Sequence, residues 1–195
     1  MIIGITGGSG CGKTTLLDLI RQQGGLVLDC DAIYHDLLQG SKPLLLSIEA
    51  RFPGVVTETG LDRKKLGRIV FSDEKALKDL NRITHSAVKE VVLARLETKP
   101  MLAAIDAIGL FEGGLAELCD VTVAITATDE NRIVRLMARE NVTEEYARLR
   151  IAAQKSNEEF ASPCDYMLEN NDTAAQFAAK CFAFLQTLGI MKENN

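Results

Sequence analysis

The chain has 195 residues, of which 47% are hydrophobic, and this suits one domain with a sizeable core. Its formal net charge of −5 at pH 7 argues against a general binder of nucleic acid or of a membrane surface. The five cysteines are odd in number and widely spaced, which is typical of reduced thiols in the cytoplasm. Because no signal-peptide pattern and no apolar run long enough to span a bilayer occurs, we expect a cytoplasmic protein without a membrane segment.

A glycine-rich segment lies near the start of the chain. The apolar residues 2–5 lead into 7–14, which read GGSGCGKT, and an apolar-periodic segment follows. This order predicts a strand, a loop whose backbone N–H groups surround an anion, and a helix. The pattern indicates a nucleoside-triphosphate site in which Lys13 contacts the β- and γ-phosphates and the Thr14 hydroxyl ligates Mg²⁺. A turn with an incidental lysine is the alternative. The expected ATP-binding residues here are Gly8, Ser9, Gly10, Cys11, Gly12, Lys13, Thr14 and Thr15.

Two carboxylates follow the second predicted strand, residues 26–28. Ligands of α/β sheets bind beyond the carboxyl ends of the strands, so we expect Asp29 and Asp31 at the same edge as the glycine loop. A kinase that acts on an alcohol needs a carboxylate to orient the hydroxyl and accept its proton, and Asp31 is the candidate. Alternatively, Asp31 caps the helix that begins at Ala32.

The next seventy residues look almost wholly helical, with only 55–56 resembling a strand. A βα unit usually returns to the sheet sooner, so residues 32–99 predict a helical lobe inserted between strands two and three. Such a lobe beside a phosphate site suggests an acceptor pocket. Residues 61–66 begin a basic helix, and a later helix carries Arg82, His85 and Lys89 on one face. A solvated charged surface is the other explanation for these side chains.

The third predicted strand, 101–105, ends at Asp106, so either Asp29 or Asp106 is expected to hold Mg²⁺ through water. A glycine-containing loop with one acid, Glu112, follows. After a fourth strand at 121–125, Asp129 opens a helix with three arginines on one face: Arg132, Arg135 and Arg139. These arginines either face a polyphosphate and stabilise its transferring phosphoryl group, or they lie on a solvated surface.

Residues 143–160 form a charged, strongly helical segment that contributes Arg148, Arg150 and Gln154. Its capping box at Thr143 is weak, because Tyr146 replaces the usual Glu or Gln. A polar helical excursion at this point predicts a lid that closes and excludes water. A fifth strand at 164–168 and a packing helix at 173–188 complete the pattern.

Several motifs, in the correct order over nearly the whole chain, resemble the dephospho-CoA kinase family. They are ITGGSGCGKTT, LDCDAI, LDRKKLGRIVF, ITH, GLFE, RLMARE and RIAAQ, followed by an Asp-plus-Asn segment. The resemblance implies one α/β domain with a five-stranded parallel P-loop NTPase sheet, helices on both faces, a helical acceptor lobe and a lid. The implied divisions are a core of 1–31, 100–139 and 161–195, a lobe of 32–99 and a lid of 140–160.

The resemblance also implies a reaction, in which ATP phosphorylates the ribose 3′-hydroxyl of dephospho-CoA to give CoA and ADP. In this comparison Asp31 matches the acid that activates the hydroxyl, Lys13 and Thr14 match the phosphate and Mg²⁺ ligands, and Arg139 matches a lid-side arginine that contacts ATP. The catalytic residues are then Asp31, Lys13 and Arg139, and the acceptor-binding residues are Asp31, Arg63, His85 and Glu112. The partners would be ATP and dephospho-CoA, and the protein a monomer or weak homo-oligomer.

The sequence departs from the family pattern at four positions near the acceptor and the lid: Ser86, Ile108, Gly109 and Phe160. A P-loop kinase for another nucleoside, nucleotide or sugar is therefore the second hypothesis. A GTPase or a nucleotide-binding regulator is the third, although 169–172 lacks the lysine of a guanine-reading NKxD segment. A side hypothesis makes Cys11 a reactive thiolate, activated by Lys13 and the helix start, with Cys30 as a partner.

Overall fold

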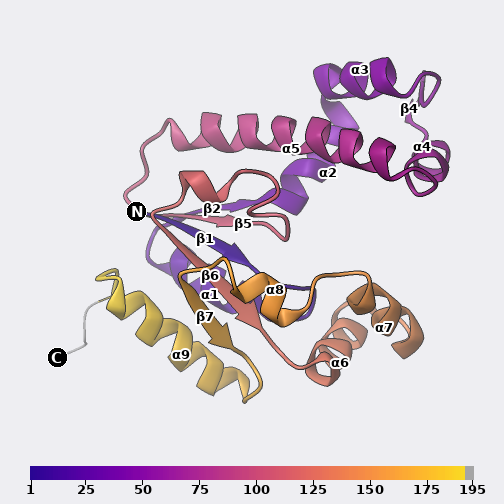
Figure 1. The fold of residues 1–195 in the computed structure, drawn as a ribbon. Helices are drawn as coiled ribbons and strands as arrows, with labels where there is room; N and C mark the ends of the chain where they lie inside the picture. Colours follow the sequence, from indigo (N-terminus) through magenta and orange to yellow (C-terminus); the bar gives the residue numbers. More distant parts are fainter. Residues whose placement is uncertain (192–195) are drawn as a thin grey trace. The chain divides into compact units, whose positions relative to one another are not determined.

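The computed structural model describes residues 1–191, and the chain divides into two compact units. The sheet unit comprises residues 1–28, 100–110 and those from 116 onward, and the helical unit comprises 29–99 and 111–115. Figure 1 shows the elements of both units along the chain. Within residues 1–191, no helix is long and apolar enough to cross a membrane.

The sheet has five strands, with the strand of the glycine-rich segment at its centre. In spatial order they are β2 (Leu26–Asp29), β5 (Ala103–Asp106), β1 (Ile2–Thr6), β6 (Val121–Thr126) and β7 (Tyr166–Glu169). β1 pairs in parallel with β5 and β6, and β6 pairs in parallel with β7. The five predicted strands are confirmed, although β5 and β7 each begin two residues later than the sequence pattern indicates.

Burial on both faces explains the apolar composition of the central strands. All six residues of β6 are buried. On one face, α1 (Lys13–Gln22) and α9 (Ala174–Thr187) pack against each other over a core that includes Ile3, Ile5, Leu16, Ile20, Phe177 and Leu185. On the other face, α8 (Asn157–Ala161) packs against β6 (Figure 1). The prediction of a parallel sheet with helices on both faces is confirmed.

The helical unit has its own apolar core, which includes Leu38, Leu44, Ile48, Leu66 and Val70. Its helices are α2 (Cys30–Gly40), α3 (Lys42–Arg51), α4 (Arg63–Val70) and α5 (Glu74–Leu96). The strand-like residues 55–56 overlap β3 (Val56–Thr57), which pairs antiparallel with β4 (Gly60–Leu61); the sequence pattern missed β4 and this pairing. The Glu49 carboxylate stabilises the entry to this hairpin by accepting the N–H groups of Gly54 and Val56.

The segment expected to be one helical lid contains two helices and a break. The chain runs from α6 (Asp129–Glu140) into α7 (Glu144–Ala152), leaves the helix, and enters α8 through a capping box of Ser156 and Glu159. At Thr143 only the single bond from the Tyr146 N–H to the Thr143 hydroxyl forms. α7 packs on α6 through a small apolar cluster that includes Leu136 and Ala147.

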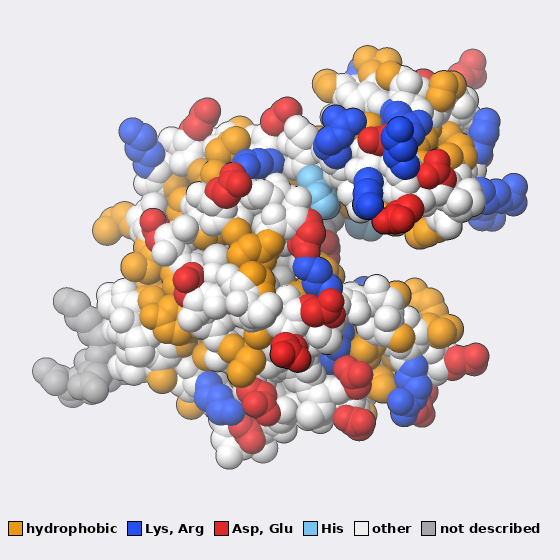
Figure 2. All heavy atoms as spheres, viewed as in Figure 1, with side chains coloured by type: hydrophobic (Ala, Val, Ile, Leu, Met, Phe, Trp, Pro, Cys, Tyr) orange, Lys and Arg blue, Asp and Glu red, His pale blue; other side chains and the backbone are white. Residues whose placement is uncertain are grey.

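Basic side chains gather on the helical unit in Figure 2. Its exposed lysines and arginines include Arg63, Lys64, Lys65, Arg68, Lys75 and Lys78, from α4 and the first turns of α5. The overall negative charge of the chain is therefore unevenly distributed, with basic side chains concentrated on α4 and the first turns of α5.

Candidate nucleotide-binding and phosphoryl-transfer site

The glycine loop connects the end of β1 to the start of α1. Gly7 has a φ of +139° and Gly12 a φ of +93°, in the region that L side chains rarely adopt. Space is also lacking, because a Cβ on Gly7 would lie 2.2 Å from the Ile125 carbonyl oxygen. A Cβ on Gly12 would lie 2.2 Å from Asn170 Nδ2. The loop therefore needs glycine at both positions to follow this path.

The loop ends at a helix start without a side-chain cap. The N-cap of α1 is Gly12, which makes no side-chain hydrogen bond. In α2 to α9, by contrast, a capping side chain accepts a backbone N–H; the caps are Asp29, Ser41, Asp62, Asp73, Thr128, Thr143, Ser156 and Thr173. The first-turn N–H groups of a helix have no intrahelical partner and favour an anion. An anion such as a phosphate can provide this missing cap for α1.

The Lys13 side chain lies across the loop. Its Nζ donates to the Gly7 carbonyl oxygen at 2.9 Å and is 3.9 Å from Asp106 Oδ1. The Lys13 and Asp106 side chains are both 15% exposed. Asp106 is brought there by the sheet, since it pairs in register with Ile5 near the end of β1. A lysine ammonium and a carboxylate thus lie together at the loop.

A cavity of about 390 Å³ opens between the loop and α6. Its walls are Gly10, Gly12, Thr14, Arg135, Ala138 and Arg139. The Arg139 side chain is 58% exposed and pairs with Glu140, which also pairs with Arg150. Hydrogen bonding from Arg139, with the nearby Arg150 charge, holds the pKa of the Glu140 carboxyl below its ordinary value. Arg139 is therefore at the cavity, with Glu140 as its partner.

Asn170 supports the loop from the end of β7, and sequence reasoning gave it no role. Its side chain is buried, and Nδ2 donates to the Cys11 carbonyl oxygen at 2.8 Å. Its Oδ1 and its carbonyl oxygen accept from Arg135 Nη2 at 3.2 and 3.0 Å. Arg135 also donates to the Gly10 carbonyl oxygen. An asparagine directly after the last strand, at the edge of the sheet where ligands bind, was the available signal.

The predicted face of three arginines does not act as one surface. Arg132 is only 2% exposed and donates from Nε to the Ser9 carbonyl oxygen at 3.0 Å. Arg135 bonds to the loop and to Asn170, and only Arg139 is mostly exposed. The solvated-surface alternative is wrong for Arg132, which is buried against the loop. Arg135 and Arg139 line the cavity beside the loop, and their contact with a polyphosphate stays a prediction.

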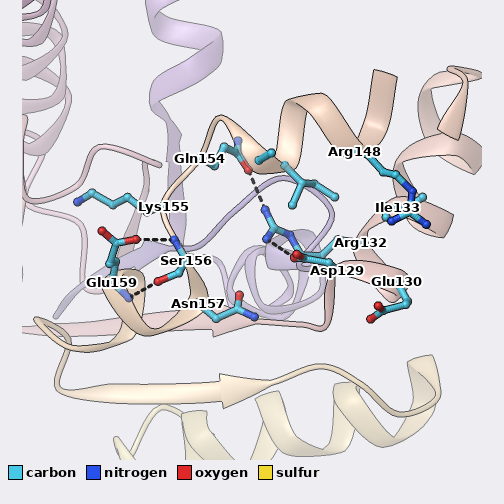
Figure 3. Close-up of a pocket in the computed structure, with 12 residues that line it drawn as sticks. Asp129, Glu130, Arg132, Ile133, Arg148, Gln154, Lys155, Ser156, Asn157 and Glu159 are labelled. Atoms are coloured by element: carbon cyan, nitrogen blue, oxygen red, sulfur yellow. Dashed lines mark hydrogen bonds and ion pairs between the residues drawn. The ribbon is translucent and has the colours of Figure 1, made fainter. Parts of the chain in front are cut away.

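A second cavity of about 770 Å³ lies between α6, α7 and residues 154–159 (Figure 3). Figure 3 shows Arg132 pointing toward Gln154 and Asp129 at its wall. None of its lining residues is a glycine of the loop. Because phosphate binding needs those backbone groups, the smaller cavity is the candidate site for a triphosphate.

Asp31 lies in the first turn of α2 and its side chain is exposed. The cap of this helix is Asp29, whose Oδ1 accepts the Ala32 N–H at 2.9 Å. The alternative in which Asp31 caps the helix is therefore wrong. The Asp31 carboxylate lies in the first turn of α2 and is not the side chain that caps this helix.

The other expected acceptor residues also belong to the helical unit. Arg63 opens α4 and is exposed, and its charge partly offsets the burial that raises the pKa of Tyr34. His85 is half-buried on α5, and burial lowers its pKa. Glu112 is exposed. The structure thus brings Lys13, Thr14, Asp106 and Arg139 together in the sheet unit, and it carries Asp31 and these three residues on the helical unit.

The reactive-thiolate hypothesis for Cys11 is wrong. The side chain is 0% exposed and packs in the core between the sheet and α1. Burial raises the pKa of the thiol, and this effect exceeds the opposing influence of Arg132 and Lys13. Cys30, the second thiol of that hypothesis, is also buried.

The donor set at the loop fits Mg²⁺. Within residues 1–191, no group of three or more His, Cys, Asp and Glu side chains could enclose a metal ion. Mg²⁺ usually keeps several waters and binds through one or two protein oxygens together with substrate phosphates. Thr14, exposed at the cavity, and the Asp106 carboxylate beside Lys13 supply oxygens of this kind.

A family model described as dephospho-CoA kinase (CoaE) matches residues 1–176. The chain belongs to the dephospho-CoA kinase family. It is 35% identical over 194 residues to a dephospho-CoA kinase of Geobacillus kaustophilus, a match that covers 95% of this chain and 96% of the relative. The resemblance seen in the motifs is confirmed, and membership of this family makes the chain an ATP-dependent kinase.

Two solved structures share the fold of this chain. The crystal structure of TT1252 from Thermus thermophilus is 32% identical, with a TM-score of 0.80 over 98% of each chain. A dephospho-CoA kinase from Campylobacter jejuni is 24% identical, with a TM-score of 0.65 over 97% of this chain and 98% of that chain. At that identity the second likeness supports the fold alone.

Proposed function

We propose that this family member transfers the γ-phosphoryl group of ATP to the ribose 3′-hydroxyl of dephospho-CoA, giving CoA and ADP. The observation that carries the proposal is the glycine loop at the uncapped start of α1, with Lys13 across it, in a chain that belongs to the dephospho-CoA kinase family. The loop supplies the phosphate site, and the family supplies the acceptor.

The triphosphate of ATP binds along the loop, residues 8–15, on the backbone N–H groups at the start of α1. Lys13 leaves the Gly7 carbonyl oxygen and contacts the β- and γ-phosphates. Arg139, at the wall of the same cavity, contacts the phosphates from α6 and stabilises the charge on the transferring group. The Arg139 guanidinium pairs with Glu140 beside the cavity.

Thr14 and either Asp106 or Asp29 would hold Mg²⁺ with the phosphates, the carboxylate acting through water. Bound there, the ion would neutralise the negative charge that develops on the phosphates during transfer. The Asp29 side chain already uses one oxygen to cap α2, and its second oxygen remains for water.

Asp31 orients the acceptor hydroxyl and accepts its proton. The 3′-oxygen forms a bond to the γ-phosphorus as the bond between that phosphorus and the β,γ-bridging oxygen breaks, so the leaving group is ADP. Arg63, His85 and Glu112 bind the acceptor on the helical unit, whose basic side chains suit the anionic pyrophosphate of dephospho-CoA. A half-buried, neutral His85 can accept or donate one hydrogen bond there.

The organisation expected from the sequence is part of this proposal. Residues 32–99 would serve as the acceptor lobe and 140–160 as a lid within one kinase domain, with the core formed by 1–31, 100–139 and 161–195. A lid at this place would exclude water from the phosphoryl group during transfer. We expect the enzyme to be cytoplasmic and a monomer or weak homo-oligomer, with no nucleic-acid or membrane partner.

The test is ADP release from ATP and Mg²⁺, with and without dephospho-CoA, beside a panel of nucleosides, nucleotides and sugars. We expect strong stimulation by dephospho-CoA alone, with CoA as the second product. Equal ADP release without any acceptor, or stimulation by a different acceptor, would contradict the proposal. Omitting Mg²⁺ should remove turnover.

A further inference from the structure

Arg132 is a buried cation directly behind the phosphate loop. Its side chain is 2% exposed, yet its guanidinium has three hydrogen-bond partners. Nε donates to the Ser9 carbonyl oxygen at 3.0 Å, Nη2 to Gln154 Oε1 at 2.9 Å, and Nη1 to Asp129 Oδ1 at 3.0 Å. Burial of a guanidinium is unfavourable unless its donors are paired, so this arrangement fixes the side chain in one position.

Gln154 completes the set of contacts from the segment after α7. Its Oε1 accepts the Ser9 N–H at 2.9 Å, and its Nε2 donates to the Ser9 hydroxyl at 2.9 Å. Arg132 and Gln154 together therefore satisfy the N–H, the carbonyl oxygen and the hydroxyl of Ser9. A loop residue with all three polar groups held in this way cannot rotate its peptide planes independently.

Arg132 leaves no room for a side chain on Gly8, the residue before Ser9. A Cβ on Gly8 would lie 2.2 Å from Arg132 Nη2, and its nearest contacts also include the guanidinium carbon and Gln154. Glycine at position 8 therefore provides the room in which Arg132 reaches Ser9. This second observation, independent of the hydrogen bonds, shows that the guanidinium and the loop are fitted to each other.

We infer that Arg132 and Gln154 are positioning residues for ATP: they fix the Ser9 peptide so that the loop N–H groups face the phosphates. They also tie the loop to residues 153–156, the break that follows the proposed lid helix α7. The inference rests on the proposed function only in taking ATP as the ligand of the loop. Neither side chain lines the cavity assigned to the triphosphate, so both act through the loop backbone.

Two variants separate the geometry of this network from its charge. Gln154→Glu keeps an oxygen for the Ser9 N–H and Arg132, and it accepts from the Ser9 hydroxyl, but it cancels the buried positive charge. Arg132→Lys keeps the charge but loses the fork that reaches Ser9 and Gln154 at once. If positioning is the role, Gln154→Glu retains ATP affinity within about threefold, and Arg132→Lys weakens it about tenfold.

The measurement is the ATP dissociation constant by titration calorimetry, with steady-state KM values for ATP and the acceptor. Gln154→Ala should weaken ATP binding and raise the ATP KM about tenfold, while the acceptor KM changes less than twofold. Gln22→Ala and Arg21→Lys, on the exposed end of α1, are the matched controls and should leave these values unchanged.

Two results would overturn the inference. One is wild-type ATP affinity in both Gln154→Ala and Arg132→Lys. The other is a larger loss of ATP affinity in Gln154→Glu than in Gln154→Ala, with Arg132→Lys unaffected, because the charge and not the geometry of the network would then govern binding. The binding series does not depend on the acceptor. If the wild-type protein binds ATP but leaves dephospho-CoA unphosphorylated, the proposed function fails while the positioning roles are still measured.

Discussion

The Lys13 ammonium lies at the phosphate loop, where it contacts two oxygen groups of the protein. It is held there by the Gly7 carbonyl oxygen at 2.9 Å, with the Asp106 carboxylate 3.9 Å away, and in the proposed function it moves from these partners to the phosphates. We predict that Lys13→Ala lowers kcat by about 100–1000-fold, the usual loss for one donor aimed at developing charge. ADP release at saturating ATP and acceptor measures this. Less than a threefold change would contradict the assigned role, and circular dichroism should confirm an unchanged fold.

At Asp31 the prediction separates chemistry from binding. Because Asp29 already caps α2, replacement of Asp31 should leave the helix intact. We expect Asp31→Asn to bind ATP as the wild type does and to lose about 100–10,000-fold in kcat, since the amide cannot accept the hydroxyl proton. Calorimetric ATP titration and CoA formation measure the two effects. Normal turnover in this variant would show that Asp31 is not the base.

Single residues differ in how far the sequence could predict their roles. The positions of Lys13 and Thr14 could be predicted from the GxxxxGK[ST] motif, because the loop and the helix start that fix them are adjacent in the sequence. The spacing of Arg132, Arg135 and Arg139 shows only that they share a face of α6. Which element packs against that face depends on contacts with residues more than a hundred positions away, such as Ser9. The roles of Arg132 and Arg135 were therefore not available from periodicity.

At the scale of an element, Gly12 and Gly24 allow a matched test of how the loop and α1 depend on glycine. Gly12 and Gly24 lie at opposite ends of α1 and both have positive φ, but only Gly12 lacks room for a Cβ. Gly24→Ala should cost about 1–2 kcal/mol from left-handed backbone alone, or about 2–8 °C in melting temperature. Gly12→Ala should cost more, because the Cβ would displace Asn170 from Cys11.

The same pair should differ in ligand binding. We expect Gly12→Ala to weaken ATP binding at least tenfold and Gly24→Ala to leave it unchanged, since only the first alters the loop. Thermal denaturation and ATP titration of both variants measure this. Equal losses of affinity would show that the backbone path at Gly12 is not what binds the phosphates.

The elements themselves were mostly predictable, and the exceptions have local causes. The five strands and the long helices follow from apolar runs and 3.6-residue periods. In the helical unit, the sequence pattern indicated a strand only at 55–56 and missed β4 and its pairing with β3, because strands of two residues give no period and the entry to the hairpin is stabilised by the Glu49 side chain of α3. The break after α7 was missed because Ala153 and Gln154 are good helix formers locally.

On the scale of the whole molecule, acid should destabilise both units. The pKa values of Asp165, Asp79 and Glu49 are lowered, the first by hydrogen bonds from Thr122, the second mainly by Arg51 and the third by backbone N–H groups. A carboxyl with a folded-state pKa below its unfolded value stabilises the protein above the unfolded value. That contribution is lost as the pH falls through the folded pKa.

We therefore predict a melting temperature that is nearly constant from pH 7 to about pH 5 and falls below about pH 4. Asp165→Asn should make the acid-side decline shallower, because the amide oxygen can still accept from Thr122 but does not titrate. Melting curves at pH 3 to 7 measure this. An identical slope in wild type and variant would show that Asp165 is not linked to folding.

The residues that hydrogen-bond to the phosphate loop are also synthesised long after the loop itself. Ser9 is separated from Arg132 by 123 positions and from Gln154 by 145, and Cys11 is separated from Asn170 by 159. A ribosome that adds about 5–20 residues per second takes roughly 8–30 s to cover the longest of these separations. The nascent chain therefore carries an unsupported glycine loop for most of its translation. Affinity for nucleotide should appear only when the last strand has emerged and docked.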